Sequence, residues 1–340
     1  MKMLPGTLYR RGSRLSAYGL PAFVFLLLLS WNLAHATAAG LLFVAQNSPK
    51  TVDIIDPGSS LRVGGINAGE SPMDMALSPD GRWLAVSNRT ASVERPGIIW
   101  IIDPKKKEVV RKIDLYLTRY RDWEEIYLVF SRDGKKLYAV ESGTGFLDVF
   151  STGDWRFVKK IPLGGKPQNP VTSPDGGWLY VPCLHSGEIA VVDVLQDKVK
   201  DRIRIEGRPS AVALSHDGGL VYAADGENHL VVVIDMKTRG VVKKISVGSS
   251  PQNMALLDGR FLYVLNTYSN NLSVIDVDKL ENVKSIAIGA LPGKMAYDPV
   301  SRRLYVLTDN ATISVVDTTA QKFIKSIPTD ITPRGIVFAP

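Results

Sequence analysis

The amino-acid sequence predicts an all-β protein, a seven-bladed β-propeller built from four-stranded antiparallel blades. Three observations lead to this fold class. A turn motif recurs at nearly constant spacing, short segments rich in Val, Ile and Tyr lie between the turns, and the two ends of the chain carry complementary fragments of one repeat. A repeat of about 40–45 residues with four strands is typical of a propeller blade.

The turn motif sets the length of the repeat. It occurs as Ser-Pro-Asp-Gly or a variant of it, and an Asp-Gly pair suits a tight hairpin because glycine readily adopts a positive φ. Five successive aspartates of the motif are 42, 42, 41 and 40 residues apart: Asp133, Asp175, Asp217, Asp258 and Asp298.

Each turn is followed by segments that have the composition of strands. In one repeat an apolar strand at Leu220–Ala224 leads to another strand that ends at Ile234-Asp235. A charged turn then precedes a further strand that ends near Gly248. Short runs of β-branched and aromatic residues between Gly and Pro turns favour strands. No stretch after residue 36 keeps the 3.6-residue period of an amphipathic helix.

The two ends of the chain each supply part of one blade. Residues 41–46, 52–56 and 61–66 give three strands without a first strand, and residues 333–338 give a first strand with nothing after it. We therefore expect the C-terminal strand to pair with the N-terminal strands, which closes the ring and removes a free sheet edge. First strands should begin near residues 72, 125, 167, 209, 251, 292 and 333, which makes seven blades.

The N-terminal segment predicts export. Basic residues precede an apolar run from Gly19 to Leu33, and Ala34-His35-Ala36 provides a small-residue cleavage pattern, as in a secretory signal peptide. We expect a signal peptide at 1–36, cleavage near Ala36, and a propeller at 37–340 in the periplasm of a bacterium. The alternative is an uncleaved anchor, which would be the protein's only contact with a membrane.

Charge and cysteine content exclude several functions. The segment before residue 37 carries four of the positive charges and no acid, so its removal reduces the formal charge from +7 to +3. That balance does not favour nucleic acid as a partner. A single cysteine, Cys183, excludes covalent haem attachment through CxxCH, a CxxC redox pair and a multi-cysteine zinc site.

The repeats resemble a known family. The segment 262–266, Leu-Tyr-Val-Leu-Asn, followed by 271–276, Asn-Leu-Ser-Val-Ile-Asp, is similar to the YVTN repeat of YncE-like periplasmic propellers. The resemblance covers residues 41–340 and implies the fold. It implies no single function, because the repeat motif is structural and the wider family includes binding proteins, haem-binding propellers and subunits of amine dehydrogenases.

Polar residues at the start of the first strands form the first candidate site. The position two residues after each blade-opening proline, or its equivalent, should surround the mouth of the central channel, together with some of the residues that precede it. A small anion or a peptide could bind there through Lys294 and Arg334, and the alternative is a ring of polar groups that binds channel water. The candidates at this mouth are Asp74, Tyr127, Gln168, Asn169, Gln252, Asn253, Lys294 and Arg334.

Irregular loops on the same face form the second candidate. The loop at 88–97 is the longest after a second strand, and the segment 116–124 lengthens one link between blades. Long polar loops on a rigid scaffold often carry function, although a decorated surface without a ligand is the alternative. The candidate residues of this face are Asn88, Arg89, Arg95, Arg119, Arg121, Trp123 and Tyr268.

His185 and His229 lie in equivalent loops of adjacent blades and could ligate a metal or a haem iron, although exposed loop histidines are common. The sequence does not identify a cofactor. It also contains no GxSxG nucleophile elbow, no P-loop and no GxGxxG between a strand and a helix.

These observations favour a non-enzymatic binding module for a periplasmic protein or a small ligand. One alternative is a non-covalent haem-like cofactor, or an accessory subunit in periplasmic redox metabolism. Another is a metal-dependent hydrolase such as a lactonase, for which Asp74, Asn169 and Asn253 are the candidate metal ligands.

Overall fold

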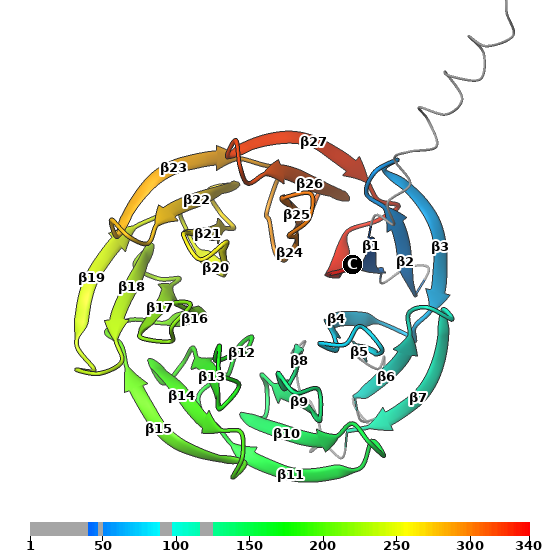
Figure 1. The fold of residues 1–340 in the computed structure, drawn as a ribbon, viewed down its shortest axis with the longest axis horizontal. Helices are drawn as coiled ribbons and strands as arrows, with labels where there is room; N and C mark the ends of the chain where they lie inside the picture. The colour runs from blue at the N-terminus through cyan, green and yellow to red at the C-terminus, as the bar shows by residue number, and fades with distance from the viewer. Residues whose placement is uncertain (1–39, 47–49, 89–96, 116–124) are drawn as a thin grey trace, which may run out of the picture. The chain divides into compact units, whose positions relative to one another are not determined.

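Seven four-stranded antiparallel sheets stand as blades around a central axis (Figure 1). This arrangement is seen in a computed structural model that describes residues 40–46, 50–88, 97–115 and 125–340. It confirms the fold class predicted from the repeats. No helix long and apolar enough to cross a membrane is present among these residues.

In six blades the strands follow the order of the sequence with the first strand innermost, and in blade one the innermost strand comes from the C-terminus. Blade one contains β28 (Pro333–Ala339), β1 (Leu41–Gln46), β2 (Thr51–Asp56) and β3 (Leu61–Asn67). The next three blades are β4 (Pro72–Leu77), β5 (Leu84–Asn88), β6 (Ile98–Asp103), β7 (Glu108–Asp114); β8 (Ile126–Phe130), β9 (Lys136–Glu141), β10 (Phe146–Ser151), β11 (Phe157–Pro162); and β12 (Val171–Thr172), β13 (Trp178–Cys183), β14 (Glu188–Asp193), β15 (Lys198–Arg204). The last three are β16 (Pro209–Leu214), β17 (Leu220–Asp225), β18 (Leu230–Asp235), β19 (Val241–Ser246); β20 (Pro251–Leu257), β21 (Phe261–Asn266), β22 (Asn271–Asp276), β23 (Glu281–Ala287); and β24 (Met295–Asp298), β25 (Arg303–Thr308), β26 (Thr312–Asp317), β27 (Lys322–Pro328).

Blade one closes the ring as the sequence predicts. Strand β28 pairs antiparallel with β1 in a register that places Phe338 opposite Leu42 and Ile336 opposite Val44. The Phe338 ring also stacks on Tyr305 of blade seven, with 6.4 Å between ring centroids. The C-terminal strand therefore joins the N-terminal strands by its backbone and the neighbouring blade by a side chain.

Two first strands are shorter than the sequence pattern suggests. In blade four the regular pairing is limited to Val171–Thr172, and Pro167 makes only an isolated bridge to Cys183. Pro170 lies between them and has no N–H to donate, which interrupts the ladder. In blade seven the first strand begins at Met295 rather than near residue 292.

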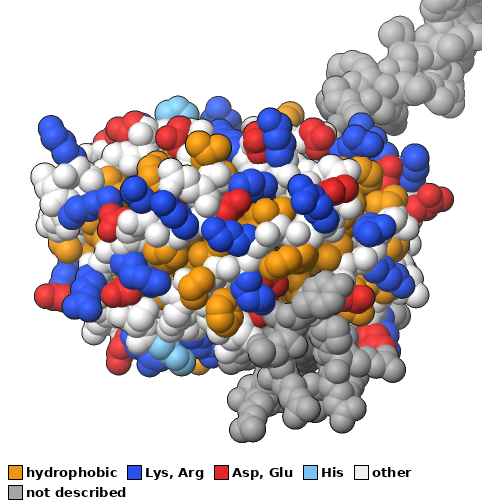
Figure 2. Space-filling view, turned by 90° about the horizontal axis from the view of Figure 1, so that it is seen from below, with side chains coloured by type: hydrophobic (Ala, Val, Ile, Leu, Met, Phe, Trp, Pro, Cys, Tyr) orange, Lys and Arg blue, Asp and Glu red, His pale blue; other side chains and the backbone are white. Residues whose placement is uncertain are grey.

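The second and third strands of each blade form the core, and the fourth strands form the outer wall. Strand β17, for example, is buried along all but its first residue, whereas β27 is exposed along most of its length. Phe323 and Ile324 of β27 are each about 40% exposed. Figure 2 shows apolar side chains, lysines, arginines and acids interleaved on the wall. Charged side chains on an edge strand oppose pairing with another chain.

Blade three contains a buried group of charges. The Lys160 Nζ lies 2.7 Å from Glu141 Oε1 and 3.0 Å from Asp148 Oδ1, and both carboxylates are almost fully buried. Burial and the neighbouring Glu141 carboxylate raise the pKa of Asp148 to about 7. One ammonium faces two carboxyl groups here, so a proton on Asp148 balances the charge.

Candidate functional site at the channel mouth

The inner ends of the first strands surround a cavity of about 270 Å³. Its walls come from six blades, because each first strand begins at the same end of the channel and brings one or two side chains to it. Seven of the eight residues predicted for the channel mouth line this cavity: Tyr127, Gln168, Asn169, Gln252, Asn253, Lys294 and Arg334. Sequence reasoning thus located a set of residues that the fold brings together.

Asp74, the eighth predicted residue, lies in contact with the cavity wall. Its Oδ1 pairs with Lys294 Nζ, and its Oδ2 accepts a hydrogen bond of 2.8 Å from the backbone N–H of Leu128. The side chains of Asp74 and Lys294 are only 9% and 20% exposed. The ion pair connects blades two and seven, and the hydrogen bond from the Leu128 N–H links Asp74 to blade three as well.

This ion pair fixes the charge state of Lys294. Burial acts to lower the pKa of the ammonium, but the carboxylates of Asp74 and Glu125 outweigh it, and the pKa of Lys294 is raised. The ammonium also lies 5.4 Å from the centroid of the Tyr127 ring. Lys294 is therefore a charged, neutralised group and not a free amine.

Tyr127 and Gln168 form a neutral pair in the same wall. The Tyr127 hydroxyl donates to Gln168 Oε1 at 3.1 Å, and Gln168 Nε2 donates to the carbonyl of Lys166 at 3.1 Å. Burial, reinforced by the charge of Glu125, raises the pKa of Tyr127 well above its usual value. The phenol therefore keeps its proton and acts as a hydrogen-bond donor.

Three hydrogen-bond donor side chains of the wall are available to a ligand, and the carboxylate of Asp309 in the same lining also has no side-chain partner among the described residues. Within the described residues, the amides of Asn169 and Asn253 and the guanidinium of Arg334 make no hydrogen bond or ion pair, and all three line the cavity. They come from blades four, six and one. Gln252 differs, because its Nε2 donates to Ser250 Oγ at 3.0 Å.

The loop candidates are only partly described. Tyr268 follows β21 and is 72% exposed, as expected for a loop residue. Asn88 differs from its expected place in a loop: it is the last residue of β5, opposite Ile98 of β6, and is 2% exposed, because the ladder extends one residue further than its sequence suggests. The other candidates, Arg89, Arg95, Arg119, Arg121 and Trp123, lie outside the described residues.

The two histidines lie away from the cavity. His185 and His229 are exposed in the β13–β14 and β17–β18 hairpin turns, and neither lines the channel mouth. The Nδ1 of His229 accepts a hydrogen bond of 3.2 Å from the backbone N–H of Ser250. Among the described residues, no three His, Cys, Asp or Glu side chains gather as metal ligands. The carboxylate of Asp74 already holds the Lys294 ammonium.

Sequence reasoning missed other parts of the wall. Glu125, Thr308 and Asp309 also line the cavity. Thr308 is the last residue of the second strand of blade seven and Asp309 follows it, so extending the search from the starts of first strands to the ends of second strands would have found them.

The chain belongs to the YNCE-like β-propeller family, whose sequence model matches residues 17–339. A curated relative, Antigen Lp49 of Leptospira interrogans serogroup Icterohaemorrhagiae, is 28% identical over 177 residues. That match covers 47% of this chain and only 38% of the relative.

Solved structures share the fold at low identity. A putative 6-phosphogluconolactonase from Bacteroides fragilis superimposes with a TM-score of 0.73 at 15% identity, covering 90% of this chain and 99% of that one. The dihydro-haem d1 dehydrogenase NirN, solved in complex with DHE, gives 0.66 at 15% identity, with 88% and 75% covered. At these identities the likeness establishes the fold and leaves the site to be argued from its own residues.

Proposed function

We propose that this protein is an exported, non-enzymatic binding module whose channel mouth accepts a carboxylate group. The carboxylate belongs to a small ligand or to a segment of a partner protein. The observation that carries the proposal is the set of three donor side chains, Asn169, Asn253 and Arg334, that line one cavity and have no partner among the described residues.

The chemistry of the three groups defines the ligand. A guanidinium offers a planar pair of N–H donors that matches a carboxylate, and side-chain amides supply further donors and acceptors. Lys294, the other cation of the wall, is paired with Asp74, so Arg334 is the cation of the lining without an ion pair among the described residues, in a wall that also contains the carboxylates of Glu125 and Asp309. A volume of about 270 Å³ suits a small polar group rather than a large cofactor.

The protonation states support binding rather than catalysis. A general base works best with a pKa near the operating pH. The pKa values of both Tyr127 and Lys294 are raised above their usual values, so both stay protonated near neutral pH. Neither group is poised to remove a proton from a substrate.

Native mass spectrometry of protein isolated from its own host, with in-cell cross-linking of the same cells, tests the proposal. The wild type is compared with Arg334→Gln, and Arg208→Gln outside the cavity is the control. A bound small mass that only Arg334→Gln loses supports a small ligand. A cross-linked protein that only this variant loses supports a partner segment. Equal capture by all three proteins, or capture by none, overturns the proposal.

Two further measurements test export and the cofactor alternative. Intact-mass analysis of the periplasmic fraction should give a chain that begins near Thr37; a full-length chain in the cytoplasm contradicts export. The absorbance spectrum of the same sample should show no visible band. A haem-like band that His185→Ala and His229→Ala remove would replace the proposed function with the cofactor alternative.

A further inference from the structure

Adjacent blades meet through one recurring pair of positions on the face opposite the channel mouth. The first position lies at the start of the second strand of a blade, and the other lies four residues after the last residue of the third strand of the next blade. Between blades two and three the pair is Trp83 and Trp155, whose ring centroids are 5.9 Å apart. Between blades three and four it is Lys136 and Asp197, with 2.7 Å between Nζ and Oδ2.

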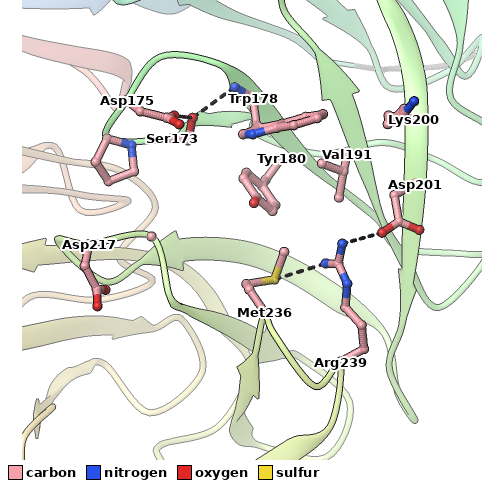
Figure 3. A pocket seen from close by; sticks show the side chains of 12 residues that line it. Ser173, Asp175, Trp178, Tyr180, Val191, Lys200, Asp201, Asp217, Met236 and Arg239 are labelled. Atoms are coloured by element: carbon pink, nitrogen blue, oxygen red, sulfur yellow. Dashed lines mark hydrogen bonds and ion pairs between the residues drawn. The ribbon is translucent and has the colours of Figure 1, made fainter.

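Between blades four and five this contact is replaced by a pocket. The pair here is Trp178 and Arg239. The Arg239 guanidinium points away from Trp178 and pairs with Asp201, with 2.6 Å between Nη2 and Oδ2 (Figure 3). Its Nη1 lies 3.3 Å from Met236 Sδ. A cavity of about 510 Å³ opens between the two blades. Within the described residues the Trp178 ring makes no contact with a cation or another ring.

A buried tyrosine directs its hydroxyl into this pocket, where the hydroxyl has no partner among the described residues. Tyr180 is 5% exposed and lines the pocket, and its hydroxyl makes no hydrogen bond in the described part of the chain. The equivalent Tyr263 of blade six donates to the carbonyl of Thr318 in the next blade at 3.0 Å. A hydroxyl without a hydrogen-bond partner, on a residue that is only 5% exposed and lines a cavity of this size, is available to a bound molecule.

The charges around the pocket favour a cation. Hydrogen bonds from Ser173 and Ser215 lower the pKa values of Asp175 and Asp217, so both carboxylates are ionised at neutral pH. Both line the pocket, together with Lys200, whose ammonium makes no ion pair within the described residues. Arg239 is neutralised by Asp201, so the remaining charge of the lining is negative.

We infer that the pocket between blades four and five binds an organic ammonium compound with an apolar body. The body packs against Trp178, Val191 and Met236, and the ammonium lies near the indole face (Figure 3), in a lining that includes Asp175 and Asp217. An indole face attracts a cation through its quadrupole, and a thioether adapts to irregular apolar shapes. The cavity lies within the size range of small-molecule sites.

Isothermal titration with two matched probes tests this inference. The probes are 2-phenylethylammonium and 3-phenylpropionate, which share a ring and differ in the sign of charge. We expect saturable binding of the ammonium and at least about tenfold weaker binding of the carboxylate. Equal binding of both probes, or binding of neither, overturns the inference.

Variants place the binding in this pocket. Arg239→Trp recreates the Trp83–Trp155 pair and should abolish binding while the protein stays folded, because Trp155 already occupies the equivalent position at φ 59°, against 60° at Arg239. Tyr180→Phe should weaken binding at unchanged circular dichroism. Arg334→Gln, at the channel mouth, should bind the probe like the wild type. Retained binding in Arg239→Trp, or loss in Arg334→Gln, contradicts the assignment and leaves the proposed channel-mouth function untouched.

Discussion

Replacing Lys294 by methionine should destabilise the propeller through the charge that it leaves behind. Lys294→Met keeps a long apolar side chain but removes the ammonium from Asp74, whose side chain is 9% exposed. Among the described residues, the carboxylate then keeps only the hydrogen bond from the Leu128 N–H. A buried charge without its partner is costly because it has lost its hydration and gained nothing in exchange.

The expected cost follows from the burial of the pair. Breaking a buried ion pair by removing one partner typically costs about 3–5 kcal/mol. The Lys294 side chain is still 20% exposed, so water can partly solvate the carboxylate, and we expect the lower end, about 3 kcal/mol. For a chain of this length that corresponds to a fall in Tm of about 5 °C.

Urea unfolding of four proteins measures this cost. The set is the wild type, Lys294→Met, Asp74→Asn and the double variant. The double variant should recover most of the stability, because an amide at position 74 still accepts the Leu128 N–H without a buried charge, so the coupling between the two sites should reach about 2 kcal/mol. A single-variant cost below about 1 kcal/mol, or strict additivity, would refute the reasoning.

The pH dependence gives a second check on the same pair. The pKa of Lys294 is raised above 10.5 in the folded state. The contribution of the pair is therefore complete below pH 10.5 and is lost as the pH rises through the folded-state value. The difference between the wild type and Lys294→Met should stay constant between about pH 6 and 9. A difference that changes within this range would point to another group.

Three further predictions concern the fold. Burial and Glu141 raise the pKa of Asp148 from 3.8 to about 7, so the wild type should lose stability as the pH rises through this range. Urea unfolding at about pH 4 and about pH 8 should show a smaller loss for Asp148→Asn. An equal loss of unfolding free energy in both proteins would contradict this. Deleting residues 333–340 removes β28 and should abolish cooperative unfolding; a normal melting curve would disprove closure. Gly207→Ala places a Cβ 1.9 Å from Asp225 Oδ2 at φ 150° and should lower the free energy of unfolding by at least about 2 kcal/mol. Gly81→Ala, where the Cβ meets open space, should lower it by about 1 kcal/mol. Equal losses in the two variants would refute the steric argument.

The repeat made the fold accessible to sequence reasoning. Spacings near 42 residues located the blades, and the incomplete repeats at the two ends predicted the pairing of β28 with β1. The departures have local causes. Pro170 shortens the first strand of blade four, and a ladder that extends by one residue buries Asn88 at the end of β5.

The channel mouth was predictable in its residues but not in its contacts. Asn169, Asn253 and Arg334 were found because repeats place equivalent positions at equivalent radii. The pairing of Lys294 with Asp74 was not predicted, because the two residues are 220 apart in sequence and lie in blades that are not adjacent.

The pocket between blades four and five was missed for a related reason. It depends on Trp178 and Arg239 together, and on which way one side chain turns. A comparison of these two positions across all blades would have shown that the pair Trp178 and Arg239 differs from the aromatic pair Trp83 and Trp155.

Photo-cross-linking from the channel mouth inside the host cell tests the central claim most directly. A photoreactive amino acid replaces Gln252, which lines the cavity and leaves Arg334 intact, and in the control it replaces Val300, which is 87% exposed on the opposite face. The account predicts one discrete adduct from position 252, competed by an excess of a carboxylate ligand, and none from position 300. Identical adducts from both positions, or no adduct from position 252, would contradict a binding site at the channel mouth.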